Sequence, residues 1–217
     1  MERHQRDHPF PALSRRPILY AITAGNGRDG LPALRAAAQA GVDLIQIREK
    51  QLSTCALLEF CTQARAAVAS TAARLLLNGR FDLALAAGLA GVHLPADGLP
   101  PARVRSLVPP GFLIGLSCHS CAEVAVAAAE GAGPDFCVLG PIFATPSKPA
   151  PLGLETLAAA ARGALPVLAL GGINLANAAA CLAHGAAGLA AIRLFQEDPA
   201  AVVAALGLLG TIPPDSA

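Results

Sequence analysis

Residues 163–192 read GALPVLALGGINLANAAACLAHGAAGLAAI, and this stretch decides the fold class. It contains no Asp, Glu, Lys or Arg and is long enough to raise the question of a membrane span. Gly171, Gly172 and Asn174 interrupt it after a short apolar run, and Gly185 interrupts it again before a second run. The predicted order is strand, turn, helix, turn, strand, which is a buried βαβ unit, with Asn174 as the N-cap of the helix.

The same alternation of short apolar runs with alanine-rich runs extends along the whole chain. It favours a parallel sheet with crossover helices. Strands are expected at 18–22, 43–47, 74–77, 91–94, 112–116, 135–139, 166–170 and 188–192, and helices at 31–40, 56–70, 81–87, 102–107, 122–130, 154–162, 175–183 and 199–209. Eight repeats predict a single (β/α)8 barrel. The alternative, a doubly wound open sheet, would leave the eighth unit without a role, and no Gly-x-Gly-x-x-Gly follows the first strand.

Length and charge limit the domain organisation and the partners. The 217 residues suffice for one barrel, predicted at 18–210, with a flexible N-terminal tail at 1–17 and a C-terminal tail at 211–217. A net charge of +1 and a charged fraction of 14% argue against nucleic acid and membrane surfaces, and favour a small-molecule ligand. The alanine-rich helices leave a homo-oligomer open.

The chain's first residues and its cysteines indicate a cytoplasmic protein. Residues 1–17 are polar and contain arginine, without the apolar core of a secretory signal. The six cysteines lie mostly inside predicted elements, not in the dense loop framework of a secreted disulfide domain. Cys118 and Cys121 form a Cys-x-x-Cys without a second pair at zinc spacing, so we expect buried or rim thiols there.

Polar and glycine residues follow several of the predicted strands. In a (β/α)8 barrel the chemistry gathers where strands end and βα loops begin, so these residues should converge at one rim. They are Arg48, Lys50, Asn78, His119, Thr145, Lys148, Gly171 and Gly172. His93 lies in an apolar run instead and is expected to be a core histidine.

The strand-end motifs resemble those of the thiamine phosphate synthase and thiazole tautomerase superfamily. Each motif alone is weak, but they occur in order and with the expected spacing from about residue 19 to about residue 199. They are QIREK (46–50), LNGR (77–80), GVHL (91–94), GLSCHS (115–120), GPIFATPSK (140–148) and GGI (171–173). The resemblance implies the same barrel fold and a role in thiamine biosynthesis.

Two positions bear on which branch of the superfamily the chain resembles. Synthases hold Mg²⁺ with an aspartate in the third-strand motif and another after the fourth strand, where this chain has Gly79 and Gly98. Glycine supplies no carboxylate for the metal. A shifted site using Asp82 and Asp97 is an alternative. The resemblance favours the tautomerase branch, with no cofactor and no metal site, and Mg²⁺ only if the chain is a synthase.

The resemblance implies that His119 is the catalytic residue. A tautomerase converts a dihydrothiazole, which carries a carboxylate, an exocyclic double bond and an ethyl phosphate, into the aromatic carboxythiazole. One imidazole can take the ring proton and return it to the exocyclic carbon. The alternative for His119 is a histidine that is hydrogen-bonded in a loop, for example as a cap of the helix beginning near residue 122.

Further site residues come from the same resemblance. Arg48, Lys50 and Lys148 would stabilise the substrate carboxylate, although Arg48 and Lys50 could instead form a rim ion pair with Glu49. The other substrate-binding residues would be Gln46, Asn78, Ser117, Thr145 and Ser147, and the phosphate-binding residues Gly171, Gly172, Ile192 and Arg193. For Thr145 and Ser147 a plain turn is the alternative.

Three functions remain open from the sequence. A metal-independent thiazole tautomerase acting on a thiazole phosphate comes first. A Mg²⁺-dependent thiamine phosphate synthase, which joins hydroxymethylpyrimidine pyrophosphate to thiazole phosphate, comes second. A non-catalytic barrel that binds thiazole or thiamine phosphate comes third.

Overall fold

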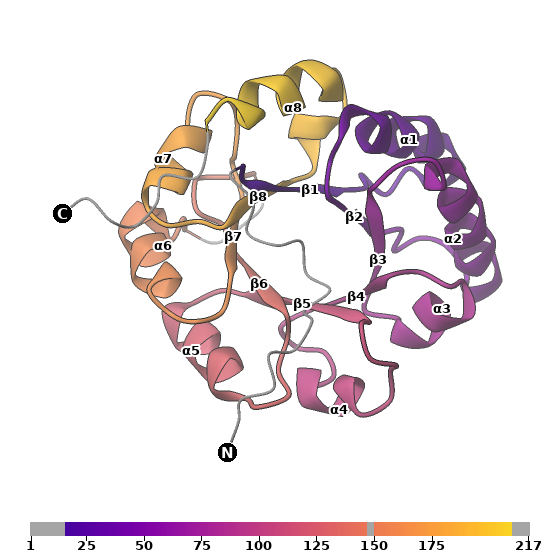
Figure 1. Ribbon diagram of the computed structural model, residues 1–217, viewed down its shortest axis with the longest axis horizontal. Helices are drawn as coiled ribbons and strands as arrows, with labels where there is room; N and C mark the ends of the chain where they lie inside the picture. Colours follow the sequence, from indigo (N-terminus) through magenta and orange to yellow (C-terminus); the bar gives the residue numbers. More distant parts are fainter. Residues whose placement is uncertain (1–15, 147–149, 210–217) are drawn as a thin grey trace.

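Eight parallel strands close into a barrel in sequence order, and the helices surround it (Figure 1). The structure is a computed structural model and describes residues 16–146 and 150–209. The strands are β1 Ile18–Ile22, β2 Leu44–Ile47, β3 Arg74–Asn78, β4 Gly91–Leu94, β5 Leu113–Cys118, β6 Phe136–Leu139, β7 Val167–Leu170 and β8 Gly188–Ala191. The helices are α1 Leu31–Ala40, α2 Thr54–Val68, α3 Phe81–Ala86, α4 Pro101–Arg105, α5 Cys121–Ala129, α6 Gly153–Ala161, α7 Ala178–Ala183 and α8 Pro199–Gly207, with short 3-10 helices η1 Gly27–Gly30 and η2 Arg193–Phe195.

The pairing of the first and last strands distinguishes the two predicted architectures. Ile18 pairs with Gly188 and Leu19 with Leu189, so β1 and β8 are neighbours. The (β/α)8 prediction is confirmed, and the open-sheet alternative is wrong. The uncharged stretch 163–192 forms β7, α7 and β8. Within the described residues, no helix is long and apolar enough to cross a membrane.

Some element ends differ from the predictions for local reasons. The helix expected at 175–183 begins only at Ala178, because the side chain of Asn174 accepts hydrogen bonds from the backbone N–H groups of Ala176 and Asn177 and holds a turn there. The N-cap is therefore Asn177, and the prediction of Asn174 as N-cap is wrong. Strand β5 runs to Cys118, two residues further than expected. Residues 1–15 of the tail predicted at 1–17, and the whole tail predicted at 211–217, lie outside the described residues.

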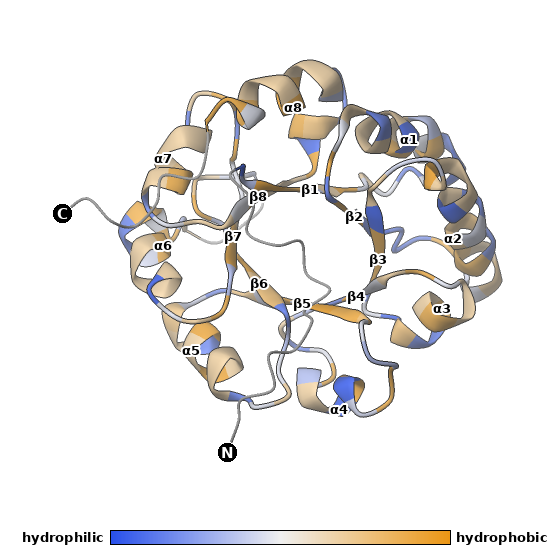
Figure 2. Cartoon of the chain, viewed as in Figure 1, coloured by the Kyte–Doolittle hydropathy of each residue, from blue (hydrophilic) through white to orange (hydrophobic). Residues whose placement is uncertain are grey.

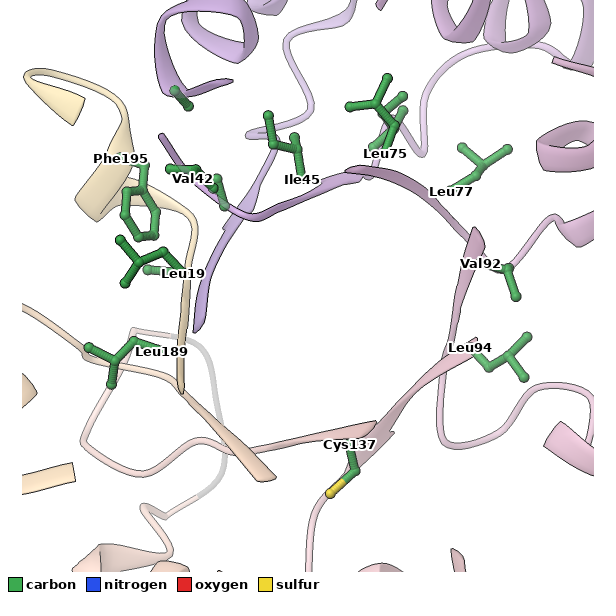
Figure 3. Close-up of a cluster of buried hydrophobic side chains, with 14 of the residues drawn as sticks. Leu19, Val42, Ile45, Leu75, Leu77, Val92, Leu94, Cys137, Leu189 and Phe195 are labelled. Carbon is green, nitrogen blue, oxygen red and sulfur yellow. The ribbon is translucent and has the colours of Figure 1, made fainter. Parts of the chain in front are cut away.

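Strand side chains alternate between two apolar cores. The outward set packs under the helices, and Figure 3 shows Leu19, Ile45, Leu77, Val92 and Leu189 pointing away from the barrel interior. Hydrophobic residues run along the strands, while hydrophilic patches lie on helices such as α1 and α4 (Figure 2). The inward set fills the lumen with Ile18, Tyr20, Ile22, Leu44, Leu76, Leu113, Phe136, Val138, Leu168 and Ala190. This packed lumen confines ligand binding to the ends of the barrel.

Gly115 makes room for a cluster of rings inside the lumen. A Cβ at this position would lie 2.5 Å from Phe136 and 2.7 Å from Nδ1 of His93. The rings of Tyr20 and Phe136 have centroids 5.7 Å apart, and those of His93 and Phe136 6.1 Å apart. These three rings form the floor beneath the carboxyl ends of the strands.

A buried ion pair ties strands together at the opposite end of the barrel. Asp135 is 8% exposed, and its Oδ2 accepts hydrogen bonds from the backbone N–H of Ile114, at 2.7 Å, and from Arg105, at 2.8 Å. Arg105 also donates to the carbonyl oxygen of Phe112 at 2.6 Å. The pair therefore connects α4, the start of β5 and the start of β6.

Asp135→Ala should lower the free energy of unfolding by about 2–4 kcal/mol, because it leaves the buried backbone N–H of Ile114 without its acceptor and the partly buried guanidinium of Arg105 without its carboxylate. The control is Arg28→Ala, which breaks the exposed Arg28–Glu59 pair and should cost about 0–1 kcal/mol. Urea denaturation of both variants measures the difference. Equal losses would contradict the role given to Asp135.

Candidate active site

The carboxyl ends of the eight strands bring most of the predicted site residues to one rim. Three of these residues lie on the lumen face, each two or four positions after an inward-facing leucine: Gln46, Asn78 and Ser117. Arg48 and His119 come one residue beyond the ends of β2 and β5, at the positions where the same alternation would continue. The topology thus supports the predicted convergence.

His119 is held by two hydrogen bonds from different groups. Its Nδ1 lies 2.8 Å from the carbonyl oxygen of Gly140, which follows β6. A carbonyl can only accept, so Nδ1 carries the hydrogen and Nε2 keeps its lone pair when the ring is neutral. The backbone N–H of His119 donates to Oε2 of Glu123 at 2.7 Å. The ring therefore presents Nε2 as a base in a fixed tautomer.

The helix after His119 is capped by its neighbour. Ser120 is the N-cap of α5, and its hydroxyl accepts from the backbone N–H of Glu123 at 3.2 Å. Glu123 in turn reaches back to His119, which gives a capping box shifted by one residue. Ser120 rather than His119 caps the helix, so that part of the alternative is wrong, whereas the hydrogen bond to Gly140 is compatible with the loop histidine of the same alternative. Glu123 was not among the predicted site residues, although the Ser-x-x-Glu spacing from Ser120 is typical of a capping box.

The loop after β2 carries the cationic side of the site. Arg48 is half-buried and Lys50 is exposed. Glu49 between them is 5% exposed and turns the other way, because its Oε2 accepts the backbone N–H of Gly27 at 2.7 Å. Within the described residues Glu49 makes no ion pair with either cation, so the alternative of a rim ion pair is wrong. The loop thus places both cations beside the strand ends.

The remaining polar residues of the predicted substrate set occupy different depths. Gln46 is 3% exposed, and its Nε2 donates to the hydroxyl of Tyr20 at 3.2 Å, so it belongs to the floor. Burial raises the pKa of the Tyr20 hydroxyl. Ser117 is half-buried, and its Oγ lies 3.0 Å from Nε2 of His93. Asn78 ends β3 half-buried, paired in register with His93.

The loop after β6 contributes Thr145, while Ser147 and Lys148 lie outside the described residues. The Thr145 hydroxyl is buried and has no hydrogen-bond partner among the described residues. A buried hydroxyl without a partner costs free energy, so a ligand atom that paired with it would be stabilised. This observation favours a binding role for Thr145 over a plain turn.

The two glycines after β7 have a packing reason to be glycine. Both have positive φ, +99° at Gly171 and +66° at Gly172. A Cβ at Gly171 would lie 2.6 Å from Pro141, and one at Gly172 would lie 2.7 Å from Phe143. The β6–α6 loop therefore lies directly against this pair. The side-chain N–H of Asn177 donates to the carbonyl oxygen of Gly172 at 2.9 Å and closes the turn.

The residues after β8 complete the predicted phosphate-binding set. Ile192 is 37% exposed, and the exposed Arg193 begins η2. Loops after the seventh and eighth strands, with a short extra helix, are a common phosphate site in this fold. The phosphate role of all four residues remains a prediction.

The donors for a protein-held Mg²⁺ are not in place. Gly79 and Gly98 have no side-chain oxygen, and both lie close to Pro95. Asp82 is bound by Arg80 through two hydrogen bonds, at 2.8 and 2.6 Å, which lower the pKa of its carboxyl, and Asp97 is exposed. Across residues 16–146 and 150–209, no group of three or more His, Cys, Asp or Glu side chains could hold a metal ion. The two positions at which the resembled synthases carry aspartates thus supply no side-chain oxygen for a metal, and the chemistry proposed below uses none.

The Cys-x-x-Cys holds two ordinary thiols. Cys118 is fully buried on β5, where a hydrogen bond from Cys137 lowers the pKa of its thiol. Cys121 is half-buried, and its Sγ donates to the carbonyl oxygen of Thr156 at 3.2 Å. The prediction of buried or rim thiols is confirmed.

Comparison with known proteins identifies the family. The family model described as thiamine monophosphate synthase matches residues 19–195. A Geobacter sulfurreducens protein named "Putative thiamine-phosphate synthase" is 45% identical over 203 residues, covering 90% of this chain and 94% of the relative. A Methanoculleus marisnigri protein named "Thiamine-phosphate synthase" is 44% identical over 181 residues, covering 80% and 85%.

A solved structure agrees with the sequence comparisons. Thiamine phosphate pyrophosphorylase from Pyrococcus furiosus superposes with a TM-score of 0.79 at 29% identity, covering 90% of this chain and 96% of that one. Together with the family match over most of the sequence, this shows that the chain belongs to the thiamine monophosphate synthase family.

Proposed function

We propose that this chain acts on a thiazole phosphate at the carboxyl-end rim of the barrel and that His119 aromatises it by proton transfer. Membership of the family makes the chain a thiamine-biosynthesis enzyme, and the tautomerase reaction is our finer proposal. The observation that supports it is the hydrogen bond from Nδ1 of His119 to the carbonyl oxygen of Gly140, at 2.8 Å. In the neutral ring this bond places the hydrogen on Nδ1 and leaves the lone pair on Nε2.

The proposed reaction returns every proton it removes. Nε2 of His119 takes the proton from the ring carbon next to the substrate carboxylate and becomes part of an imidazolium. Electrons from the broken C–H bond move through the ring toward the exocyclic double bond. The same Nε2 then gives its proton to the exocyclic carbon, and the ring is aromatic.

The cations after β2 would stabilise the charge that builds during proton removal. Arg48 can bind the substrate carboxylate with two parallel hydrogen bonds, and Lys50 can add a point charge. Lys148 has the same proposed role from the sequence. Gly171, Gly172, Ile192 and Arg193 would hold the phosphate, mainly through backbone N–H groups, so one substrate would span the rim from β2 to β8.

Thiamine phosphate synthase is the second candidate, and the comparisons support it better than the tautomerase. The similar proteins named above are called thiamine-phosphate synthase or thiamine phosphate pyrophosphorylase, and none is called a tautomerase. In this reaction Arg48, Lys50 and Thr145 would bind the leaving pyrophosphate of the pyrimidine substrate. Gly79 and Gly98 argue against the synthase, because the synthases that this sequence resembles carry Mg²⁺-binding aspartates at these two positions.

Assaying both reactions on one preparation separates the candidates. We expect NMR to show that the dihydrothiazole phosphate becomes aromatic in the presence of EDTA, because the proposed chemistry needs no metal ion. Under matched conditions with Mg²⁺, hydroxymethylpyrimidine pyrophosphate and thiazole phosphate should give no thiamine phosphate. The opposite pair of results would establish the synthase. Tight binding of the thiazole phosphate without either turnover would favour the non-catalytic barrel.

His119→Asn should lower kcat for aromatisation by about 10²–10⁴-fold, because the amide can still donate to the Gly140 carbonyl oxygen but cannot accept a proton. The dissociation constant of the carboxythiazole phosphate should change little. The control is His184→Asn, since His184 also binds a backbone carbonyl oxygen, that of Ala180, but lies at the end of α7. Full activity of the His119 variant would rule out the mechanism.

Glu123→Ala should lower kcat about tenfold with little change in KM, because the backbone of His119 loses the acceptor that fixes it. Glu123→Gln keeps a carbonyl oxygen at that place and should recover most of the activity. Glu155→Ala removes an exposed acid from the first turn of α6 and serves as the control. If the Ala and Gln variants were equally slow, Glu123 would be acting through its charge instead.

A further inference from the structure

A buried histidine below the proposed site has no part in the chemistry described so far. His93 lies in β4 and is 3% exposed, among the rings of Tyr20 and Phe136. The glycine at position 115 leaves the space that its Nδ1 occupies. Among the described residues its side chain makes one hydrogen bond, between Nε2 and the hydroxyl of Ser117, at 3.0 Å.

We propose that His93 is a positioning residue that fixes the Ser117 hydroxyl as a hydrogen-bond donor toward the ligand at the rim. The inference deepens the proposed function and rests on it in one respect, because it takes the ligand to bind above Ser117. The hydrogen bond between the two side chains does not depend on which reaction the chain catalyses.

The surroundings of His93 keep it neutral. No charged side chain is among the rings and the hydroxyl that contact it, and burial lowers the pKa of its imidazole to about 3. Near neutral pH the ring therefore has one N–H donor and one lone pair. The position of that single hydrogen decides the direction of the bond to Ser117.

The unpartnered nitrogen indicates which tautomer is present. Nδ1 is buried and has no hydrogen-bond partner among the described residues. A hydrogen on Nδ1 would be a buried N–H without an acceptor, which is rarer in proteins than a buried acceptor with an unused lone pair. The hydrogen is therefore on Nε2, and His93 donates to Oγ of Ser117.

This direction determines what Ser117 can offer a ligand. Because Oγ accepts from His93, its own O–H remains available as a donor. Ser117 is half-buried on the lumen face, two residues before His119, so the two side chains point the same way about 7 Å apart along the strand. An O–H donor at this depth suits an anionic oxygen, such as that of a carboxylate.

The tautomer can be measured without any assumption about function. Long-range ¹H–¹⁵N NMR of the histidine rings in the full chain should show a neutral His93 with its hydrogen on Nε2 at both pH 6 and pH 8. Ser117→Ala should shift the Nε2 signal. A neutral ring with its hydrogen on Nδ1, or a ring that becomes charged in this range, would overturn the proposal.

A double-mutant cycle tests whether His93 acts through Ser117. His93→Leu should lower kcat/KM about tenfold to 100-fold in the wild-type background, the range for a hydrogen bond to a charged group, and by less than about twofold in the Ser117→Ala background. His93→Gln, whose Nε2 can still reach Ser117, should restore most of the activity. Equal losses in both backgrounds would mean that His93 only supports the fold.

Two further readouts separate the ways in which the cycle could fail. If His93→Leu does not fold, the Gln variant and the tautomer of the wild-type ring still decide the matter. If wild-type protein turns over neither proposed substrate, the same cycle is measured as the dissociation constant of carboxythiazole phosphate by calorimetry. Unchanged binding in all variants would then overturn the role of His93, whereas absent turnover alone would count only against the proposed reaction.

Discussion

The pairing of β8 with β1 is the constraint on which the rest of the structure depends. Strand β8 has no charged residue, and β1 has only one polar side chain. The register between the two strands is therefore set by the apolar side chains that each must bury. Once the sheet is closed, the side chain at each strand end has only two directions. One is toward the shared rim and the other toward the helices, and the residues proposed for chemistry take the first.

The fold was readable from the sequence because the alternation of strands and helices repeats without interruption. The convergence of Arg48, Asn78 and His119 followed from the topology alone, since each comes after its own strand. The sequence could not show which nitrogen of His119 is protonated, because that depends on a carbonyl of the next strand. Nor could it show that Glu49 turns away from the adjacent cations, because its acceptor role involves a loop more than twenty positions earlier.

Glycine was interpreted in two ways in the sequence: as a phosphate-binding residue after β7, and as a replacement for a metal-binding aspartate after β3 and β4. The structure distinguishes these roles only in part. Gly171 and Gly172 were expected to expose their backbone N–H groups to a phosphate. The structure gives a second reason for glycine, because the β6–α6 loop packs where a Cβ would lie. Gly79 and Gly98 are different. They matter because neither supplies the carboxylate oxygen with which a synthase would bind Mg²⁺. Two positions among 203 aligned residues barely change an overall identity of 45%. Overall similarity is therefore a weak guide to the choice between the two reactions.

The anchor of the proposed base belongs to the main chain of Gly140, and this has a consequence for how the site can change over generations. A side-chain partner can be lost by a single substitution, but a backbone carbonyl oxygen is present whichever amino acid occupies the position. Position 140 is itself closed to larger residues, because a Cβ there would collide with the backbone oxygen of Leu170. The orientation of the imidazole is thus protected from drift at its acceptor, and specificity can diverge in the surrounding loops while the proton-transfer geometry is inherited unchanged.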